Sequence, residues 1–474
     1  MRTIMPQLGT PGLRAVHDQL CEAASVRLTG LDTAFLRLDR EASPMHLGAL
    51  ATFRPANLGD PGRVAALLAE RALRLPQLRR RVEPSWNPFA APTWADDPGF
   101  CAKDHIQVHQ LERHAGLDGA AALAAELLVH PLMRNRPLWE LHVIAGGDWD
   151  CFAVLFKMHH AFGDGVNALG IGMRLLDGFP GHPGVPGSEY GGHGMSPAPE
   201  AGVGHAWHQP GDVRRIIEDV VGRLGNVAGA AAAVLRSARL PVPWSPLVVW
   251  SSGRRAMAVV SLSLQPVRRI RRAYGGTVND VLLSVVTGAL RDWLVGRGNQ
   301  VDGLILRAFI PVSQRSAAGQ FIGGNRLSGY LCDLPVGEPD PIERLVQVQR
   351  AMARNRAAGS SRSPGAIPEL ADRLPAAVHR IATPVAGQFA SLLFDLMVTS
   401  IPVPNVSLAL DGAKLVEVFP MAPLAAGQAL VIGLSWYQSR AYVALHADRD
   451  GLPDLKRLAG AVEPAAYALA SLVE

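Results

Sequence analysis

The sequence predicts an α/β protein of two lobes, each with a sheet covered by helices. A chain of 474 residues is too long for one ordinary core, and 48% of its residues are hydrophobic, enough to fill two. Strand and helix patterns alternate in both halves of the chain, and the stretch between the halves is dense in glycine and proline. In such a fold we expect a site where the lobes meet.

Four segments follow from these changes in composition. Residues 1–27 precede the first well-patterned segment and have the spacing of a weakly amphipathic helix. Residues 28–180 form the first predicted lobe and residues 256–474 the second. Residues 181–255 read as a flexible Gly/Pro-rich linker that leads into a crossover helix.

The apolar spacing predicts the elements of both lobes. The first lobe begins with a short helix and a strand that reaches Phe53, and the glycine-rich turn after residue 145 makes two of its later strands neighbours. We also expect the last two strands of the second lobe to form a hairpin. The predicted helices cover residues 61–78, 119–133, 279–298 and 341–356, and the remaining strands cover 138–146, 151–158, 256–264, 304–313, 326–336, 396–403, 428–437 and 440–447.

Charge and cysteine content exclude several classes of protein. The net charge of +5 favours an anionic ligand or surface but is too diffuse to specify nucleic acid. The four cysteines are far apart and form no CxxC pair, so we expect neither a disulfide framework nor a zinc site, and a reducing cytoplasm fits best. The N-terminus has no secretory h-region. Residues 418–439 are uncharged, but two prolines and two glycines argue against a spanning helix.

Two adjacent histidines lie in HHAFGDG, residues 159–165, between a predicted strand and a predicted helix. An imidazole titrates near neutrality and can remove a proton from a hydroxyl that attacks a carbonyl carbon. One ring is enough for this, so we assign the base to His160, nearer the turn, and a packing or orienting role to His159. A tight turn and a helix cap are the simpler alternatives for the segment.

The other residues of this segment are expected to shape the loop. Asp164 stands where an N-cap of the next helix belongs, and its spacing does not point it at His160 as a triad member would be pointed. Gly163 and Gly165 are expected to allow unusual backbone angles. No GxSxG elbow is present, which favours direct transfer over an acyl-enzyme, and the absence of a P-loop or GxGxxG motif argues against nucleotide chemistry.

The HHxxxDG pattern after a strand resembles the signature of the CoA-dependent acyltransferase superfamily, which includes chloramphenicol acetyltransferase and peptide-synthetase condensation domains. Further blocks resemble its bacterial wax ester synthase/diacylglycerol acyltransferase branch, and the resemblance runs from about residue 28 to the C-terminus. The blocks are LDTAFLRLDREASPMHLGAL, RPLWELHVIAG, HHAFGDG, TVNDVLL, RAFIPVSQR and GGNRLSGYLCDLPVGEPDPIERL.

The resemblance implies a fold and a catalytic set. The fold would consist of two chloramphenicol-acetyltransferase-like lobes, each a mostly antiparallel or mixed sheet covered by helices, with the active site in a tunnel at their interface. His160 would be the general base, and His159, Asp164 and Gly165 would complete the motif. Asn279, from the second lobe, would be a candidate donor to the negatively charged intermediate.

Two shorter motifs are implied to bind substrate. Pro137, Leu138 and Trp139 match the PLW element of the family, on the acceptor side, and Asp280 follows Asn279 in its ND element. Without the resemblance, packing for Trp139 and helix capping for the ND pair are the simpler interpretations.

One loop departs from the family pattern. Members commonly carry SNVPGP before the final strands, whereas this chain has TSIPVP at residues 399–404. Ser400 takes the position of the asparagine, and Val403 that of the glycine. Because a β-branched valine resists backbone geometry that glycine permits, we expect a reshaped loop and an altered substrate preference.

The implied activity is transfer of a long-chain acyl group from acyl-CoA, as co-substrate, to the hydroxyl of diacylglycerol or of a long-chain alcohol. We expect no metal, no resident cofactor and no nucleic acid partner. The expected location is the cytoplasm, with peripheral association with the inner membrane or lipid droplets. The alternatives are a related acyltransferase with another alcohol or amine acceptor, and a weakly active or non-catalytic lipid-binding homologue.

Overall fold

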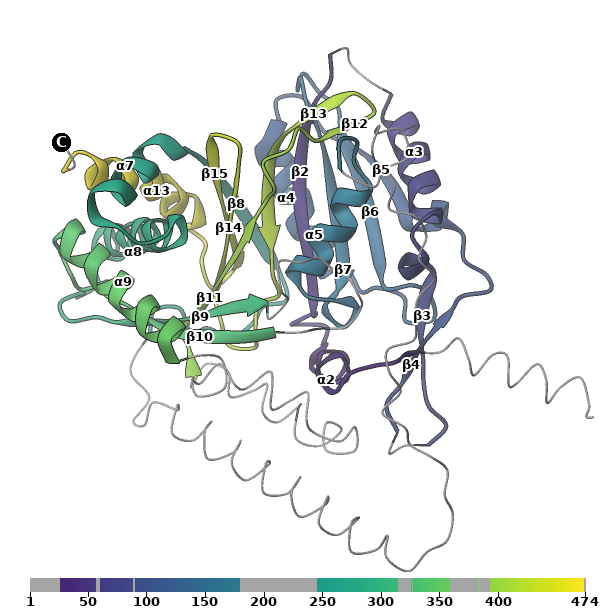
Figure 1. Cartoon of the computed structure of the whole chain (residues 1–474), viewed down its shortest axis with the longest axis horizontal. Coiled ribbons are helices and arrows are strands. Elements are labelled where there is room, and N and C mark those ends of the chain that lie inside the picture. The colour runs from purple at the N-terminus through teal and green to yellow at the C-terminus, as the bar shows by residue number, and fades with distance from the viewer. Residues whose placement is uncertain are drawn as a thin grey trace, which may run out of the picture.

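Two six-stranded sheets, a smaller three-stranded sheet and the helices around them make up the described part of the protein (Figure 1). This computed structural model describes residues 26–56, 60–87, 90–179, 245–313, 325, 327–358, 383 and 393–472. The two-lobed α/β fold with mixed sheets is confirmed. The helix predicted within residues 1–27, and the linker and crossover helix up to residue 244, lie outside the described residues.

The first sheet has the strand order β12-β13-β2-β7-β6-β5. All its pairs are antiparallel except β5 with β6. The predicted neighbours are β6 and β7, and the second of them ends at the histidine pair, where His46 of β2 lies opposite His159. The bounds are β2 His46–Arg54, β5 Ile106–Gln110, β6 Trp139–Ala145, β7 Phe152–His159, β12 Ala409–Leu410 and β13 Ala413–Met421.

Three helices pack around this sheet. Helix α3 (Pro61–Leu73) begins at an Asp60 cap, whose carboxylate accepts the Gly62 amide at 2.8 Å. Helix α4 (Gly116–Val129) buries an alanine-rich face and packs against both β2 and the second sheet. Helix α5 (Gly165–Arg174) packs against β2 and strand β11 of the second sheet (Figure 1). Both α4 and α5 therefore contact the two lobes.

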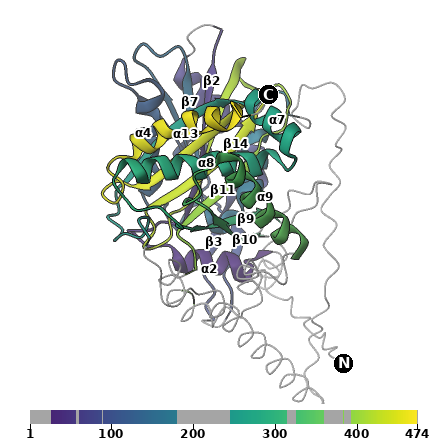
Figure 2. The same cartoon turned by 90° about the vertical axis from the view of Figure 1, so that its left-hand side faces the viewer.

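The second sheet has the order β10-β9-β11-β14-β15-β8. Strand β11 runs parallel to β9 and β14, and the other pairs are antiparallel, including the predicted β14-β15 hairpin. Helices α7, α8, α9 and α13 pack on one another and cover its outer face (Figure 2). The bounds are β8 Arg255–Ser263, β9 Leu306–Ser313, β10 Leu327–Leu334, β11 Leu396–Pro402, β14 Leu430–Tyr437 and β15 Arg440–Asp448, with α7 Leu264–Tyr274, α8 Val278–Gly296, α9 Pro341–Ala358 and α13 Leu455–Ala470.

The C-terminal half contributes strands to the first sheet, which the predicted boundaries do not show. Strands β12 and β13 belong to residues 256–474, which we assigned to the second lobe, but they extend the first sheet. Strand β13 pairs along nearly all of β2, so the C-terminal half supplies part of the first core. A division at residue 256 therefore does not separate the two sheets.

Several elements were not predicted. These are a small sheet of order β1-β4-β3 beside the first lobe and the helices α7 and α13, whereas helix α2 (Gly30–Leu38) is the short helix predicted at the start of the first lobe. The uncharged stretch 418–439 forms the end of β13 and most of β14. Among the helices that the structure describes, none combines the length and apolarity needed to cross a bilayer. The bounds of the small sheet are β1 Val26–Arg27, β3 Arg80–Glu83 and β4 Thr93–Asp96.

Candidate active site

The HHAFGDG segment links β7 to α5 through a single 3-10 turn, His160–Phe162. Gly163 has φ 162°, which is extended backbone, so the expectation of unusual angles is wrong there. A Cβ on Gly163 would lie 2.1 Å from Nδ2 of Asn167, and one on Gly165 would lie 2.9 Å from Cδ1 of Ile401. Close packing, rather than backbone freedom, therefore requires these glycines.

Asp164 is the N-cap of α5, as predicted. Its Oδ1 accepts the backbone N–H of Asn167 at 2.9 Å, and the side chain is fully buried. The cap begins the helix directly after the turn and so holds the backbone that carries His160.

His160 is half-buried and held from several sides. Its ring stacks on Phe35 of α2, with centroids 3.9 Å apart and planes 18° apart, and its backbone N–H donates to the Met45 carbonyl at 2.7 Å. Burial lowers the pKa of His160 to about 4, although the hydrogen bond of the ring with its own backbone and, to a smaller extent, the Asp164 charge act in the opposite direction. At neutral pH the ring is therefore neutral, with one nitrogen lone pair free to accept a proton.

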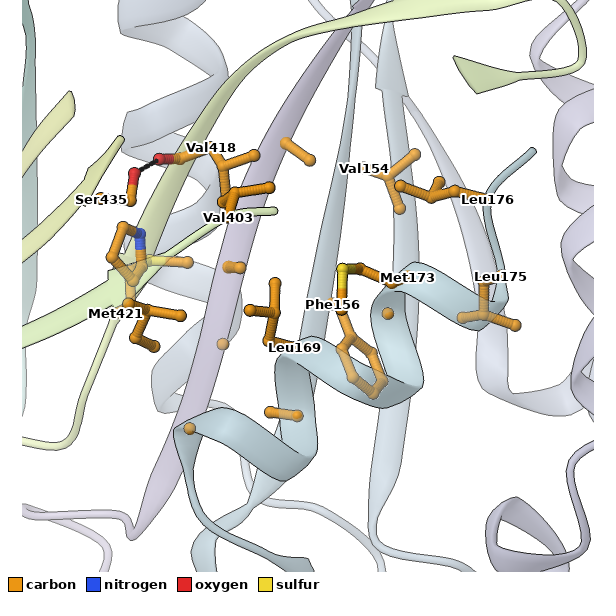
Figure 3. Close-up of a pocket in the computed structure, with 18 of the residues that line it drawn as sticks. Val154, Phe156, Leu169, Met173, Leu175, Leu176, Val403, Val418, Met421 and Ser435 are labelled. Carbon is orange, nitrogen blue, oxygen red and sulfur yellow. Dashed lines mark hydrogen bonds between the residues drawn. The ribbon is translucent and has the colours of Figure 1, made fainter. Parts of the chain in front are cut away.

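A cavity with about 1040 Å³ of empty space opens beside His160. Residues of β2, β7 and α5 form one wall of the cavity, and residues between 401 and 435, from the end of β11 to β14, form the opposite wall. Among the lining residues only His160 and Ser435 have polar side chains, and the Ser435 hydroxyl donates to the Val418 carbonyl. Figure 3 shows the apolar side chains that face one another across it, among them Val154, Phe156, Leu169, Met173, Val403 and Met421.

His159 does not line this cavity. Its Nδ1 accepts the Ala161 N–H at 3.0 Å, so the proton is on Nε2, which lies 3.4 Å from Oδ2 of Asp39. Burial raises the pKa of Asp39, but the His159 contacts more than offset this, and the pKa falls well below its usual range. The side chain therefore packs and orients, and it is not placed to contact substrate in the cavity.

The ND residues also lie away from the cavity. Oδ1 of Asn279 accepts the Ser400 hydroxyl at 2.5 Å. Asp280 completes the capping box of α8 with Thr277 and pairs with Arg356 at 3.2 Å. Neither ND residue is among the residues that line the cavity. The structure shows Asp280 as a helix cap, and the substrate-binding role of Asp280 and the donor role of Asn279 stay predictions.

The PLW residues belong to the core of the first lobe. Pro137, Leu138 and Trp139 are buried and none lines the cavity. The indole N–H of Trp139 donates to the Leu78 carbonyl at 2.7 Å, and its ring stacks on His105 with centroids 4.5 Å apart. Packing is therefore the role that the structure shows for Trp139, and a contact of the PLW residues with the acceptor stays a prediction.

Two residues that we did not single out meet at His160. Asn325 and Asp32 are buried and join His160 through hydrogen bonds between the lobes. Both lie in sequence blocks that carry the family resemblance, which is the signal that marked them. No local pattern assigns them to the histidine, because they are distant in sequence.

Solved structures define the class of the fold. A wax ester synthase/diacylglycerol acyltransferase from Marinobacter aquaeolei VT8 superposes with a TM-score of 0.68 at 23% identity, covering 94% of this chain and 100% of that one. A condensation domain of rhizomide synthetase crystallised with C8-CoA gives a TM-score of 0.54 at 14% identity, over 95% and 97% of the chains. The fold is that of the two-lobed acyltransferases and condensation domains, as the HHxxxDG motif implied.

Sequence comparisons identify the branch. The wax ester synthase/diacylglycerol acyltransferase catalytic domain matches residues 28–282, and the C-terminal domain of the same family matches residues 323–469. The chain belongs to this family and is an acyltransferase. A probable diacylglycerol O-acyltransferase of Mycobacterium tuberculosis, tgs2, is 29% identical over 452 residues, 91% of this chain and 96% of that protein. Its relative tgs1 is 28% identical over 451 residues, 94% and 96% of the two chains.

Proposed function

We propose that the protein esterifies diacylglycerol, and long-chain alcohols as a second acceptor class, with acyl groups from acyl-CoA, and that His160 is the general base. The observation that carries this proposal is the position of the half-buried imidazole on the wall of an apolar cavity. A neutral base beside apolar space suits a hydroxyl attached to a hydrocarbon chain.

The residues supply the chemistry without a metal or a resident cofactor. A ring nitrogen of His160 takes the proton as the acceptor oxygen attacks the thioester carbonyl carbon. The tetrahedral intermediate then breaks its C–S bond, and the CoA thiolate leaves with the proton that the imidazolium returns. One ester bond replaces one thioester bond, and the imidazole ends as it began.

The cavity supports an apolar substrate chain. Its lining is apolar except for His160 and Ser435, as in sites that bind largely apolar ligands. Each methylene that leaves water for such a lining contributes about 0.8 kcal/mol. Apolar walls of this kind bind a hydrocarbon chain, but they make no polar contact that would recognise a polar group at the end of the chain.

Peripheral association with a membrane or lipid droplet is part of the proposal, because diacylglycerol and long-chain alcohols reside there. The indoles of Trp86 and Trp250 are exposed to 95% and 98% in the described chain, and indole favours the interface between water and lipid. A flotation assay with vesicles that contain diacylglycerol tests this part separately from catalysis.

The main experiment gives the purified protein labelled palmitoyl-CoA with diacylglycerol, hexadecanol or a long-chain amine. We expect labelled ester with the first two, and a fall of about 10²–10⁴-fold in rate for His160→Ala. His109→Ala is the matched control, because His109 is half-buried in the same lobe and its ring nitrogen lies 3.1 Å from that of His142, away from the cavity lining.

Three outcomes would contradict the proposal. Undiminished ester formation by folded His160→Ala would remove this residue as the base. Tight binding of palmitoyl-CoA without turnover on any acceptor would instead favour the non-catalytic lipid-binding alternative, and amide formation would identify a different acceptor class.

A further inference from the structure

Asn325 makes two polar contacts with His160 and two with Asp32. The Nδ2 of Asn325 donates to the His160 carbonyl at 2.6 Å and to Oδ1 of Asp32 at 2.7 Å. Its Oδ1 lies 3.2 Å from Nδ1 of His160, and its backbone N–H donates to Asp32 at 3.0 Å. A single side chain from the second lobe thus connects to two residues of the first lobe, one of which is the candidate base.

The acceptors around Asn325 determine which way its amide faces. The Asp32 carboxylate and the His160 carbonyl accept hydrogen bonds only, so both must face the NH₂ group. The amide oxygen is then directed to Nδ1 of His160, and that nitrogen must carry the proton. In this tautomer Nε2 is unprotonated and holds the lone pair that a general base needs.

Helix α2 fixes this arrangement from the first lobe. Asp32 is buried and takes part in the capping box with Thr29, whose N–H donates to its Oδ2 at 3.0 Å. Phe35, one turn further along the same helix, stacks on the His160 ring. The helix therefore holds the face of the ring directly and its Nδ1 edge through Asn325.

We propose that Asn325 is the positioning residue that keeps His160 in the Nδ1–H tautomer, and that Asp32 holds the Asn325 amide in the required orientation. This inference rests on the proposed function, in which His160 is the base. The acceptor hydroxyl loses its proton to Nε2, and the Nδ1 proton stays in place throughout.

The same contacts favour the charged ring that forms during the reaction. When Nε2 takes the proton, the Nδ1–H bond to Asn325 becomes a charge-assisted bond, which is roughly twice as strong as a neutral one. The Asp32 carboxylate lies one amide further along and polarises that acceptor. The backbone of His160 itself also accepts a hydrogen bond from the ring and favours the protonated form, and the other charged or titratable groups that act on the ring are Asp164 and His159.

A purely structural role for Asn325, as a tie between the lobes, makes different predictions. It would lower stability without changing the tautomer or the protonation of His160. The test must therefore include a measurement that loss of stability alone does not alter.

The experiment compares Asn325→Ala and Asp32→Asn with Asn355→Ala. Asn355 of α9 is a matched control, because its Nδ2 also donates to a backbone carbonyl, that of Leu331 in β10, at 3.0 Å. It is not among the groups that form hydrogen bonds with His160. We expect Asn325→Ala to lower kcat about 10–100-fold with KM for acyl-CoA within twofold, because a misplaced base costs rate rather than binding. The acid limb of the kcat pH profile should move to lower pH, since the lost bond favoured the protonated ring.

Asp32→Asn keeps the size of the side chain and its capping oxygen, so it serves if Asn325→Ala fails to fold. It should lower kcat and shift the acid limb in the same direction. Wild-type kcat and an unchanged acid limb in folded Asn325→Ala or Asp32→Asn would overturn the proposal.

A double-mutant cycle separates this inference from the proposed function. In a His160→Ala background, Asn325→Ala should leave the residual rate unchanged, and a further fall would indicate a structural role. If His160→Ala itself retains full activity, the proposed base is wrong. If His160→Ala is inactive while Asn325→Ala is fully active, only the positioning role fails.

Discussion

The Ser400 hydroxyl donates a 2.5 Å hydrogen bond to Oδ1 of Asn279, which joins β11 to the first turn of α8. Ser400 stands where the family pattern has asparagine, so the altered loop and the ND element are in direct contact. Val403, three residues further along, lines the cavity. Of the two residues that depart from the family pattern, Ser400 therefore contacts the start of α8, and Val403 lies at the proposed chain-binding site.

Removing the first of these contacts should affect stability more than catalysis. Ser400→Ala leaves the Asn279 oxygen without this donor, and we expect the free energy of unfolding to fall by about 1 kcal/mol. KM for acyl-CoA should stay within twofold, because neither side chain borders the cavity. Chemical denaturation and steady-state kinetics measure the two effects. A tenfold loss of kcat/KM at unchanged stability would return Asn279 to the reaction.

Shortening the side chain of Val403 should change the preference for acyl-chain length. Val403 is 6% exposed and lines the cavity, so Val403→Ala enlarges the space and should favour longer or branched acyl chains in a competition between acyl-CoAs. The cost in stability is expected to be roughly 1–3 kcal/mol. Val398→Ala is the control, because Val398 is fully buried in β11 but does not line the cavity. Equal shifts in both variants would contradict the assignment.

Trp139 should prove to be a core residue. Trp139→Phe removes the indole N–H and leaves the buried Leu78 carbonyl without its 2.7 Å donor. We expect a loss of about 1–3 kcal/mol in the free energy of unfolding, with kcat/KM per folded molecule unchanged. The folded fraction is measured by circular dichroism before each assay. A selective rise in KM for the acceptor would instead support the role that the PLW resemblance implied.

Acid should destabilise the protein before its carboxylates titrate. Burial lowers the pKa of His46 and of His446 to about 4, whereas the unfolded side chains titrate near 6.5. Between these values the unfolded chain binds more protons, so the free energy of unfolding falls as pH decreases through 6.5. From pH 6.5 to 5 each buried histidine contributes a loss of up to about 2 kcal/mol.

Denaturant titrations at pH 7, 6 and 5 measure this slope. His446→Gln removes one titrating ring and should flatten the dependence, although its stability at pH 7 will also be lower because the His446 bond to the Ala422 carbonyl, 3.2 Å long, is lost. A free energy of unfolding that stays constant from pH 7 to 5 would mean that these rings are not held neutral.

Local patterns in the sequence determined most of the elements and one feature of the site. Strand and helix periods are local properties, which is why β6, β7, α3 and the β14-β15 hairpin follow from residue spacing. Asp164 was predictable as a cap for the same reason, since the bond it makes reaches only three residues along the chain. The HHxxxDG segment likewise identified His160 through contiguous residues.

Tertiary packing decided what surrounds that histidine. Asn325 is 165 residues from His160 and 293 from Asp32, and these three meet only because the lobes pack together. Strand β13 joins the first sheet across a similar distance, and the cavity exists only where both lobes contribute walls. The motifs alone did not show that Trp139 packs in the first core and that Asp280 caps α8, both outside the lining of the cavity. Residue spacing carries no information on contacts between segments so far apart, since these depend on how buried faces fit together.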